Sequence, residues 1–142
     1  MRIKASVPIA PCLISLMMLS QPLFAGQDKQ KAAIKAAETW LSLVDEGFYL
    51  RSWREGATYF KNAVSQGQWT QSMVAFRKAL GKTLSRKLTS AQYTTTLPGA
   101  PDGEYVVIQY QTSFENKLSA TETVTPMLDE DGPWKVSGYY IK

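Results

Sequence analysis

The chain has 142 residues, of which 44% are hydrophobic and 20% charged, enough apolar material for one packed domain. The formal net charge is +4, but the basic residues are scattered and form no run, which argues against a nucleic-acid-binding face. The sequence has no histidine and one cysteine. It therefore lacks the most common general base and most of the usual nitrogen and sulfur metal ligands.

Residues 1–25 predict a secretory signal peptide, with basic residues, a short apolar run and a cleavage point after about Ala25. The run is too short to span a bilayer, and an uncleaved anchor is the alternative. Cys12 lies inside the run and follows Pro11, whereas a lipoprotein signal has a small residue before its cysteine. We therefore expect Cys12 to leave with the leader. Residues 26–142 are expected to form a single periplasmic or secreted domain with no disulfide and no membrane span.

The first half of this domain predicts three helices. The first spans Gln27–Glu46 and the second Phe48–Val64, where Gly56 marks close packing or a kink. The third follows a capping-box pattern at Ser65–Gln68 and ends at Gly81. Large apolar residues recur at helical spacing and are expected to face inward: Trp40, Trp53, Trp69, Met73, Phe76 and Leu80.

From Thr83 onward the apolar period changes from 3.6 to 2, which predicts strands over 83–97, 105–115, 120–128 and 134–141. A slip in the alternation near Thr89 indicates a β-bulge. Three helices followed by four strands favour an α+β fold, with the helices on one face of a curved four-stranded antiparallel sheet.

Within the last two strands, Pro126 is expected at an edge, a bulge or a strand end because it cannot donate a ladder hydrogen bond. Residues 129–132 (Asp-Glu-Asp-Gly) predict a hairpin with a solvated tip. A calcium site is the alternative for these acids, but their spacing does not match a calcium loop. In the last strand Tyr140 is expected to share a face with Trp134 and Val136.

Three strings resemble the bacterial secreted family catalogued as domain of unknown function 4019. They are Ala-Glu-Thr-Trp-Leu at 37–41, Leu-Pro-Gly-Ala-Pro-Asp-Gly-Glu-Tyr-Val-Val at 97–107, and Glu-Thr-Val-Thr-Pro-Met at 122–127 leading to Trp-Lys-Val-Ser-Gly-Tyr-Tyr at 134–140. The resemblance covers nearly all of the mature chain. It implies an exported protein and brings no catalytic residues, because that family has no assigned activity. By analogy, the architecture resembles the nuclear-transport-factor-2-like (cystatin-like) cone, a fold that hosts enzymes and binding modules alike.

The remaining candidates for chemistry are carboxylates, phenols and one arginine. Glu122 shares a strand face with apolar residues, where a raised pKa would suit an acid or base. The alternative is that Glu122 faces solvent or pairs with Lys117. Arg86 interrupts an apolar face and is expected to close a pocket mouth, to pair with a carboxylate on a neighbouring strand, or to form a surface salt bridge.

Three functional hypotheses follow. The first is a non-enzymatic module that binds an unknown small molecule or protein in an aromatic-lined pocket, with no catalytic residue, metal or cofactor. The second is an isomerase or lyase with Glu122 as base and tyrosine donors. The third is a homodimer formed through an outer sheet face centred on Tyr105, Val107 and Gln109. The candidate ligand-binding residues are Trp40, Tyr49, Trp53, Trp69, Tyr110 and Glu122. For Trp40, simple core packing is the alternative.

Overall fold

The computed structural model describes residues 22–142, so most of the predicted leader, including Cys12, lies outside the described part. The helices are α1 (Pro22–Asp45), α2 (Tyr49–Arg54), α3 (Thr58–Ala63) and α4 (Gln66–Leu80). The strands are β1 (Thr83–Thr94), β2 (Tyr105–Phe114), β3 (Lys117–Leu128) and β4 (Trp134–Ile141). They form one antiparallel sheet in the order β1-β2-β3-β4, which confirms the α+β class.

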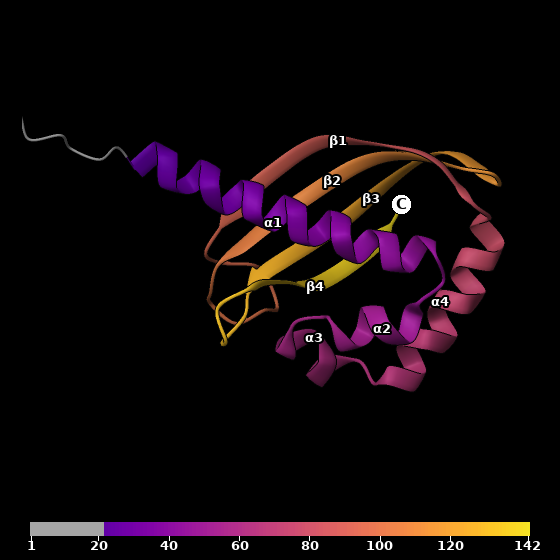
Figure 1. The fold of residues 1–142 in the computed structure, drawn as a ribbon, viewed down its shortest axis with the longest axis horizontal. Helices are drawn as coiled ribbons and strands as arrows, with labels where there is room; N and C mark the ends of the chain where they lie inside the picture. Colours follow the sequence, from indigo (N-terminus) through magenta and orange to yellow (C-terminus); the bar gives the residue numbers. More distant parts are fainter. Residues whose placement is uncertain (1–21) are drawn as a thin grey trace, which may run out of the picture.

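Helix α1 lies along the inner face of the sheet and contacts all four strands (Figure 1). It begins at Pro22, several residues before the predicted start at Gln27, and proline is well tolerated in the first turn of a helix. The proposed cleavage point at Ala25 therefore lies within α1. Among residues 22–142 no helix is long and apolar enough to cross a membrane.

The single helix predicted over 48–64 is instead two short helices, and the count of three predicted helices is therefore wrong. The break falls at Glu55–Ala57, where the backbone N–H of Ala57 donates to the carbonyl of Val136 on β4. Gly56 explains the tight fit, because a Cβ there would lie 2.6 Å from the ring of Phe60. The helical spacing of apolar residues continues across this break, so periodicity alone could not reveal the break.

Helix α4 begins with the predicted capping box: Ser65 and Gln68 each bond the other's backbone N–H. The predicted inward face is wrong at one position. Trp69, Met73 and Leu80 are buried as expected, but Phe76 is exposed and Arg77 occupies the buried position. The guanidinium finds an acidic partner on α1, described below, and this pairing makes its burial tolerable.

The sheet contains the bulge predicted near Thr89, seen as a register shift between Leu88 and Ser90. Another register shift, at Pro126, is consistent with the prediction of a bulge for that proline, but the sequence analysis did not predict its effect on β4. Val136 pairs with Pro126 and Gly138 with Thr125, so β4 carries one extra residue there.

This extra residue reverses the alternation in the second half of β4. Tyr139 pairs with Val124 and faces the core, whereas Tyr140 pairs with Thr123 and is 57% exposed. The predicted face for Tyr140 is therefore wrong.

The core lies between α1, α2, α4 and the inner face of the sheet. Trp40 and Trp69 are buried with ring centroids 5.7 Å apart, and the Trp40 ring meets the edge of Tyr139 at 5.3 Å. Ser52, also buried, links the two indoles: its carbonyl accepts from Trp40 Nε1 at 2.8 Å and its hydroxyl accepts from Trp69 Nε1 at 3.0 Å. Core packing thus accounts for both indoles.

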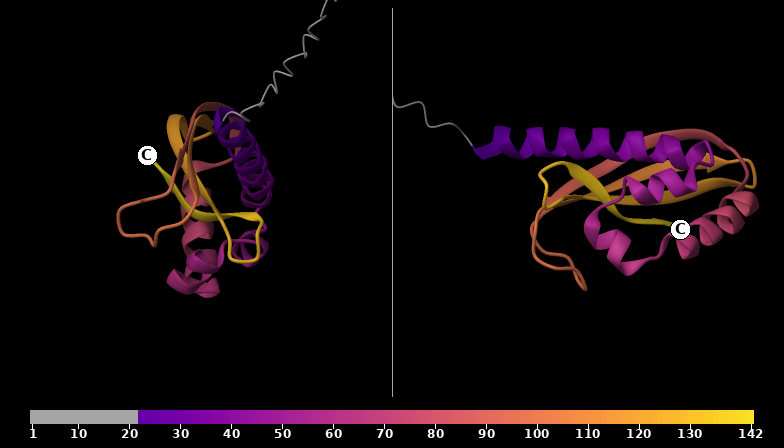
Figure 2. Two further views of the ribbon diagram at one scale, coloured as in Figure 1. Left: turned by 90° about the vertical axis from the view of Figure 1, so that its left-hand side faces the viewer. Right: turned by 60° about the horizontal axis from the view of Figure 1, so that its bottom comes forward.

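The loop between β1 and β2 protrudes at one end of the molecule (Figure 2) and covers Tyr105. The phenol donates to the carbonyl of Pro101 at 2.6 Å, and only 1% of the residue is exposed. The prediction that Tyr105 is exposed at the centre of a dimer surface is therefore wrong. A residue on the outer face of the sheet is buried here because a loop folds back over it.

Candidate functional site

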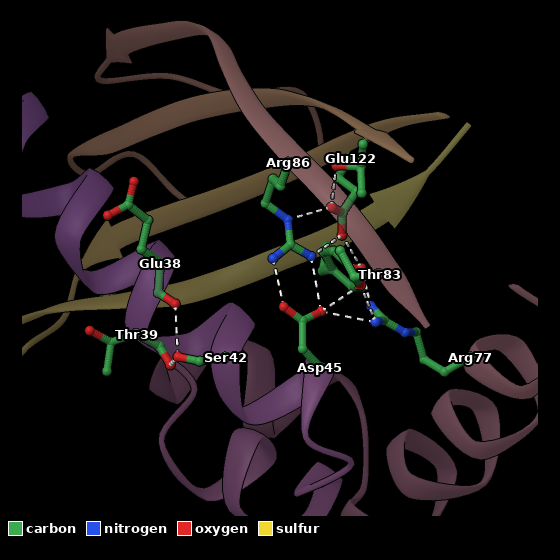
Figure 3. A network of polar contacts seen from close by, with 10 residues as sticks. Glu38, Thr39, Ser42, Asp45, Arg77, Thr83, Arg86 and Glu122 are labelled. Carbon is green, nitrogen blue, oxygen red and sulfur yellow. Dashed lines mark hydrogen bonds and ion pairs between the residues drawn. The ribbon is translucent and has the colours of Figure 1, made fainter. Parts of the chain in front are cut away.

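A partly buried ionic network joins the inner face of the sheet to the helices (Figure 3). At its centre is Glu122 on β3, which is 0% exposed. Arg86 on β1 reaches across β2 and grips both carboxylate oxygens, with Nε to Oε1 at 2.6 Å and Nη2 to Oε2 at 3.2 Å. Thr112 donates to Oε1 and Tyr139 to Oε2, so four hydrogen bonds satisfy this carboxylate.

The network extends to Asp45, the last residue of α1. Arg86 Nη1 donates to one oxygen of Asp45 at 2.7 Å, and Arg77 Nη2 donates to the other at 2.9 Å. Thr83 accepts from Arg77 at 2.8 Å and donates to Asp45 at 3.0 Å. A carboxylate at a helix C-terminus is unfavourable toward the helix dipole. The two arginines outweigh that cost and fix the ends of α1, α4 and β1 to β3.

The titration behaviour of the network follows from its pairing. Burial raises the pKa of Asp45, but the hydrogen bonds and charges of Arg86 and Arg77 more than offset this and hold that pKa below its ordinary value. Burial and then the nearby Glu122 charge raise the pKa of Tyr139 far above its usual range, so the phenol stays protonated as a donor. Two arginines face two carboxylates, and the cluster is electrically balanced.

Both simpler interpretations of Glu122 are wrong, because it neither faces solvent nor pairs with Lys117. The surface-salt-bridge interpretation of Arg86 is wrong as well, since its partner Glu122 is fully buried. The carboxylate and a phenol do converge, as the enzyme hypothesis requires. However, the lone pairs of Glu122 are occupied by donors, and it lines none of the three grooves described below. The arrangement therefore provides a rigid support rather than an accessible base.

The acidic hairpin between β3 and β4 is only partly solvated. Asp131 is exposed, but Asp129 is buried and accepts from the backbone N–H of Thr58 at 3.2 Å and its hydroxyl at 3.1 Å. Asp129 thus anchors the start of α3, which corrects the prediction of a wholly solvated tip. No group of three or more metal-ligating side chains occurs within the described residues.

A groove of about 600 Å³ opens between α1, the end of α2 and the start of β4. Ala32, Ala36 and Thr39 form its α1 side at helical spacing and leave room because they are small. Trp40 and Val136 lie at its base, and Trp134 forms the opposite wall. The volume lies within the range of about 300–1,000 Å³ typical of small-molecule sites.

The rim of this groove is positively charged. Lys35, Arg54 and Lys135 line it together with one acid, Glu55. Glu55 pairs with Arg51, and Lys135 pairs with Asp131 and Asp129. Over residues 22–142, Lys35 and Arg54 take part in no ion pair. The groove thus combines an apolar base with cations free to meet an anion.

The predicted ligand-binding residues are separated in the structure. Trp40 lines the groove just described, and Tyr49 lines two other grooves near α4. Trp53 is half-buried and donates to the carbonyl of Val64 at 2.7 Å, while Trp69 lies in the core. Tyr110 and Glu122 are cross-strand partners on the inner face of the sheet. Burial raises the pKa of Tyr110 to about 12, and its hydroxyl has no hydrogen-bond partner among the described residues.

Residue-by-residue reasoning missed the residues that form the groove, above all Lys35, Arg54 and Trp134. One signal was present in the sequence. Ala32, Ala36 and Trp40 recur four residues apart, which predicts a stripe of small side chains leading to a large ring. The sequence does not predict that Arg54 and Trp134 lie at the groove, because their positions depend on the break between α2 and α3 and on the β3–β4 hairpin.

Comparison with known proteins agrees with the resemblance noted from the three strings. A family model described as "Protein of unknown function (DUF4019)" matches residues 36–139, from the middle of α1 almost to the end of β4. No curated protein matches the chain. The matched range contains α2 to α4 and β1 to β3 completely and most of β4, and the chain therefore belongs to the DUF4019 family.

Proposed function

We propose that this protein is an exported, non-enzymatic module that binds a small amphipathic anion in the groove between α1, α2 and β4. The observation that carries the proposal is the apolar surface of Trp40, Val136 and Trp134 beside Lys35 and Arg54, two cations with no ion pair within residues 22–142. The predicted leader at residues 1–25 supports export to the periplasm or beyond.

The chemistry of the groove suggests how such a ligand would be oriented. Trp134 is half-buried and Trp40 is buried, so an aromatic or aliphatic body would pack on an apolar surface fixed by the core. A carboxylate, sulfonate or phosphate on the same molecule would point outward to Lys35 and Arg54. The network at Glu122 would have no contact with the ligand and would serve to hold α1 against the sheet.

Indole-3-acetate is a suitable probe, with neutral indole-3-acetamide as its matched control. We expect the carboxylate to shift the indole N–H resonance of Trp134 in a nitrogen-correlated NMR spectrum, and the amide to bind more weakly. Lys35→Ala should lower the affinity about fivefold, because one exposed ion pair is worth up to about 1 kcal/mol. Lys31→Ala is the control, since Lys31 is exposed on α1 but does not line the groove.

Equal binding of the amide and the carboxylate would contradict the role of the cationic rim. Shifts confined to residues around Phe48 and Val74 would place the probe in a different groove and refute the proposed site. An acid–base enzyme built on Glu122 and Tyr139 is the weaker alternative, because this contact lies outside the three grooves and the carboxylate is saturated with donors.

A further inference from the structure

A second groove, of about 590 Å³, lies along the junction of α2 and α4 and is lined by exposed apolar side chains. Phe48 and Val74 are each 51% exposed, and Leu50 is also exposed. Gly47 and Thr70, both small, widen the groove. Three large apolar residues exposed around one concavity are typical of a binding surface rather than of scattered surface residues.

A smaller groove of about 330 Å³ adjoins the second one: Tyr49 and Val74 line both, and Thr70, Val74 and Lys78 follow one another along α4 from the larger part to the smaller. Basic residues lie at the two ends of this continuous path. Arg51 and Arg54 line one end, and Lys78 and Lys82 line the other. We call the whole path, defined by Phe48, Leu50, Val74 and these four basic residues, the α2–α4 groove.

Acidic residues along the α2–α4 groove are few. Asp45 lines the smaller part, but it is already paired with Arg77 and Arg86. Glu115 also lies at this far end. The larger part is lined by Arg51 and Arg54 and by no acid. Arg51 pairs with Glu55, which does not line this groove, and Arg54 takes part in no ion pair within residues 22–142. An apolar centre therefore lies between two positively charged ends.

We propose that the α2–α4 groove docks a segment of a partner protein that carries apolar anchor residues flanked by Asp or Glu. Apolar anchors would enter the groove between Phe48, Leu50 and Val74, as in helix-in-groove recognition. Acidic flanks would meet the basic ends, which gives the charge complementarity that sets specificity and rate of association.

Two other occupants fit less well. A flat bilayer surface would leave the concave centre unfilled, whereas a peptide side chain can enter it. A second copy of this chain offers exposed acidic residues at the tips of its hairpins. Glu130 and Asp131 are followed by Gly132 and Pro133, with no large apolar anchor adjacent on the exposed tip. At the β2–β3 turn Glu115 lies near the exposed Leu118, but Glu115 itself lines the groove and the basic Lys117 precedes Leu118. An acidic amphipathic segment of a different protein satisfies both the shape and the charge.

The test uses a fluorescent amphipathic peptide built from leucine and glutamate, with a leucine–lysine peptide of the same pattern as control. We expect the acidic peptide to bind and the basic one not to. Val74→Asp and Lys78→Glu should each weaken binding at least about tenfold, because a central anchor and a flanking charge are lost. Ser72→Asp and Lys117→Glu are matched controls away from the groove and should bind as the unmodified protein does.

The variants avoid Arg54, since it lines both the α2–α4 groove and the groove proposed for the small anion. Retention of indole-3-acetate binding by Val74→Asp would show that the two sites fail independently. Peptide binding that survives both variants would overturn the proposal. So would binding to phosphatidylglycerol vesicles that is lost in the same variants, or self-association of the protein that Val74→Asp abolishes in sedimentation.

Discussion

Two clusters of cationic side chains in this molecule have opposite surroundings. In the network at Glu122, Arg77 and Arg86 each have a carboxylate partner and lie largely out of water. In the groove between α1 and β4, Lys35 and Arg54 are exposed above an apolar base and have no such partner in the described chain. Saturated charges stabilise the fold, and unsaturated ones remain available to a ligand. Position relative to acids, rather than residue type, separates the two roles.

The largest expected effect comes from removing one side of the buried network. Arg86→Met leaves the fully buried Glu122 without a counter-ion, and we expect the free energy of unfolding to fall by about 3–5 kcal/mol. Urea unfolding followed by tryptophan fluorescence measures this change. The double variant Arg86→Met/Glu122→Gln should recover part of the loss, because the buried charge is removed as well. A loss below about 1 kcal/mol would show that the network contributes little to stability and would contradict the structural role assigned to it.

The base of the groove should behave as part of the core. Ser52→Ala removes the acceptor of the Trp69 indole N–H, and leaving a buried donor unpaired costs about 1–3 kcal/mol. Equilibrium unfolding of this variant should be compared with that of Ser42→Ala, whose hydroxyl is exposed on α1. Equal stability of the two variants would argue against a hydrogen-bonded core at Trp69, the indole that packs against Trp40 at the groove base.

A smaller, pH-dependent effect is expected at Asp45. Its pKa is below the ordinary value of 3.8 in the folded state, so the stabilisation it gives is complete above that value and is lost as the pH falls through the folded-state pKa. The stability difference between the wild type and Asp45→Asn should therefore be greatest near neutrality and shrink in acid below about pH 4. Urea midpoints over a pH series measure it. A difference that is constant with pH would contradict the ionic role of Asp45.

The smallest effect on stability is expected at the groove rim. Lys35→Ala should change the free energy of unfolding by less than about 0.5 kcal/mol, because an exposed, unpaired side chain is removed. The same variant is expected to bind indole-3-acetate less tightly than the wild type. Thermal unfolding and NMR titration of one sample measure the two effects together. Destabilisation by more than about 1 kcal/mol would assign Lys35 to the fold instead.

Local patterns predicted most of the elements. The helix-to-strand change after Gly81, the capping box at Ser65 and the bulge near Thr89 each depend on a few neighbouring residues, and each is confirmed. The break at Gly56 was not resolved, because apolar spacing continues through it. Its cause is a contact with Val136, far away in the sequence.

The candidate site was less predictable for the same physical reason. Whether Glu122 is buried depends on donors from β1, β2 and β4, and Arg86 lies 36 residues away from it in sequence. Likewise, Arg77 takes the buried position expected for Phe76, and its charge is met by Asp45 on another helix. Sequence periodicity shows which face of an element is apolar, but it does not show which charges will meet there.

Tyr139 and Tyr140 are adjacent, so the presence or absence of the extra residue in β4 decides which of the two phenols faces the core. If β4 paired without it, Tyr140 would turn inward and still bring a phenol toward Glu122, so the tyrosines alone do not select the observed pairing. Ile141 favours the observed pairing, because in that pairing its side chain packs with Leu80, Phe114 and Ala120. In the pairing without the extra residue, Lys142 would take the place of Ile141 in this apolar cluster. One aliphatic side chain at the end of β4 thus favours the observed register between β3 and β4.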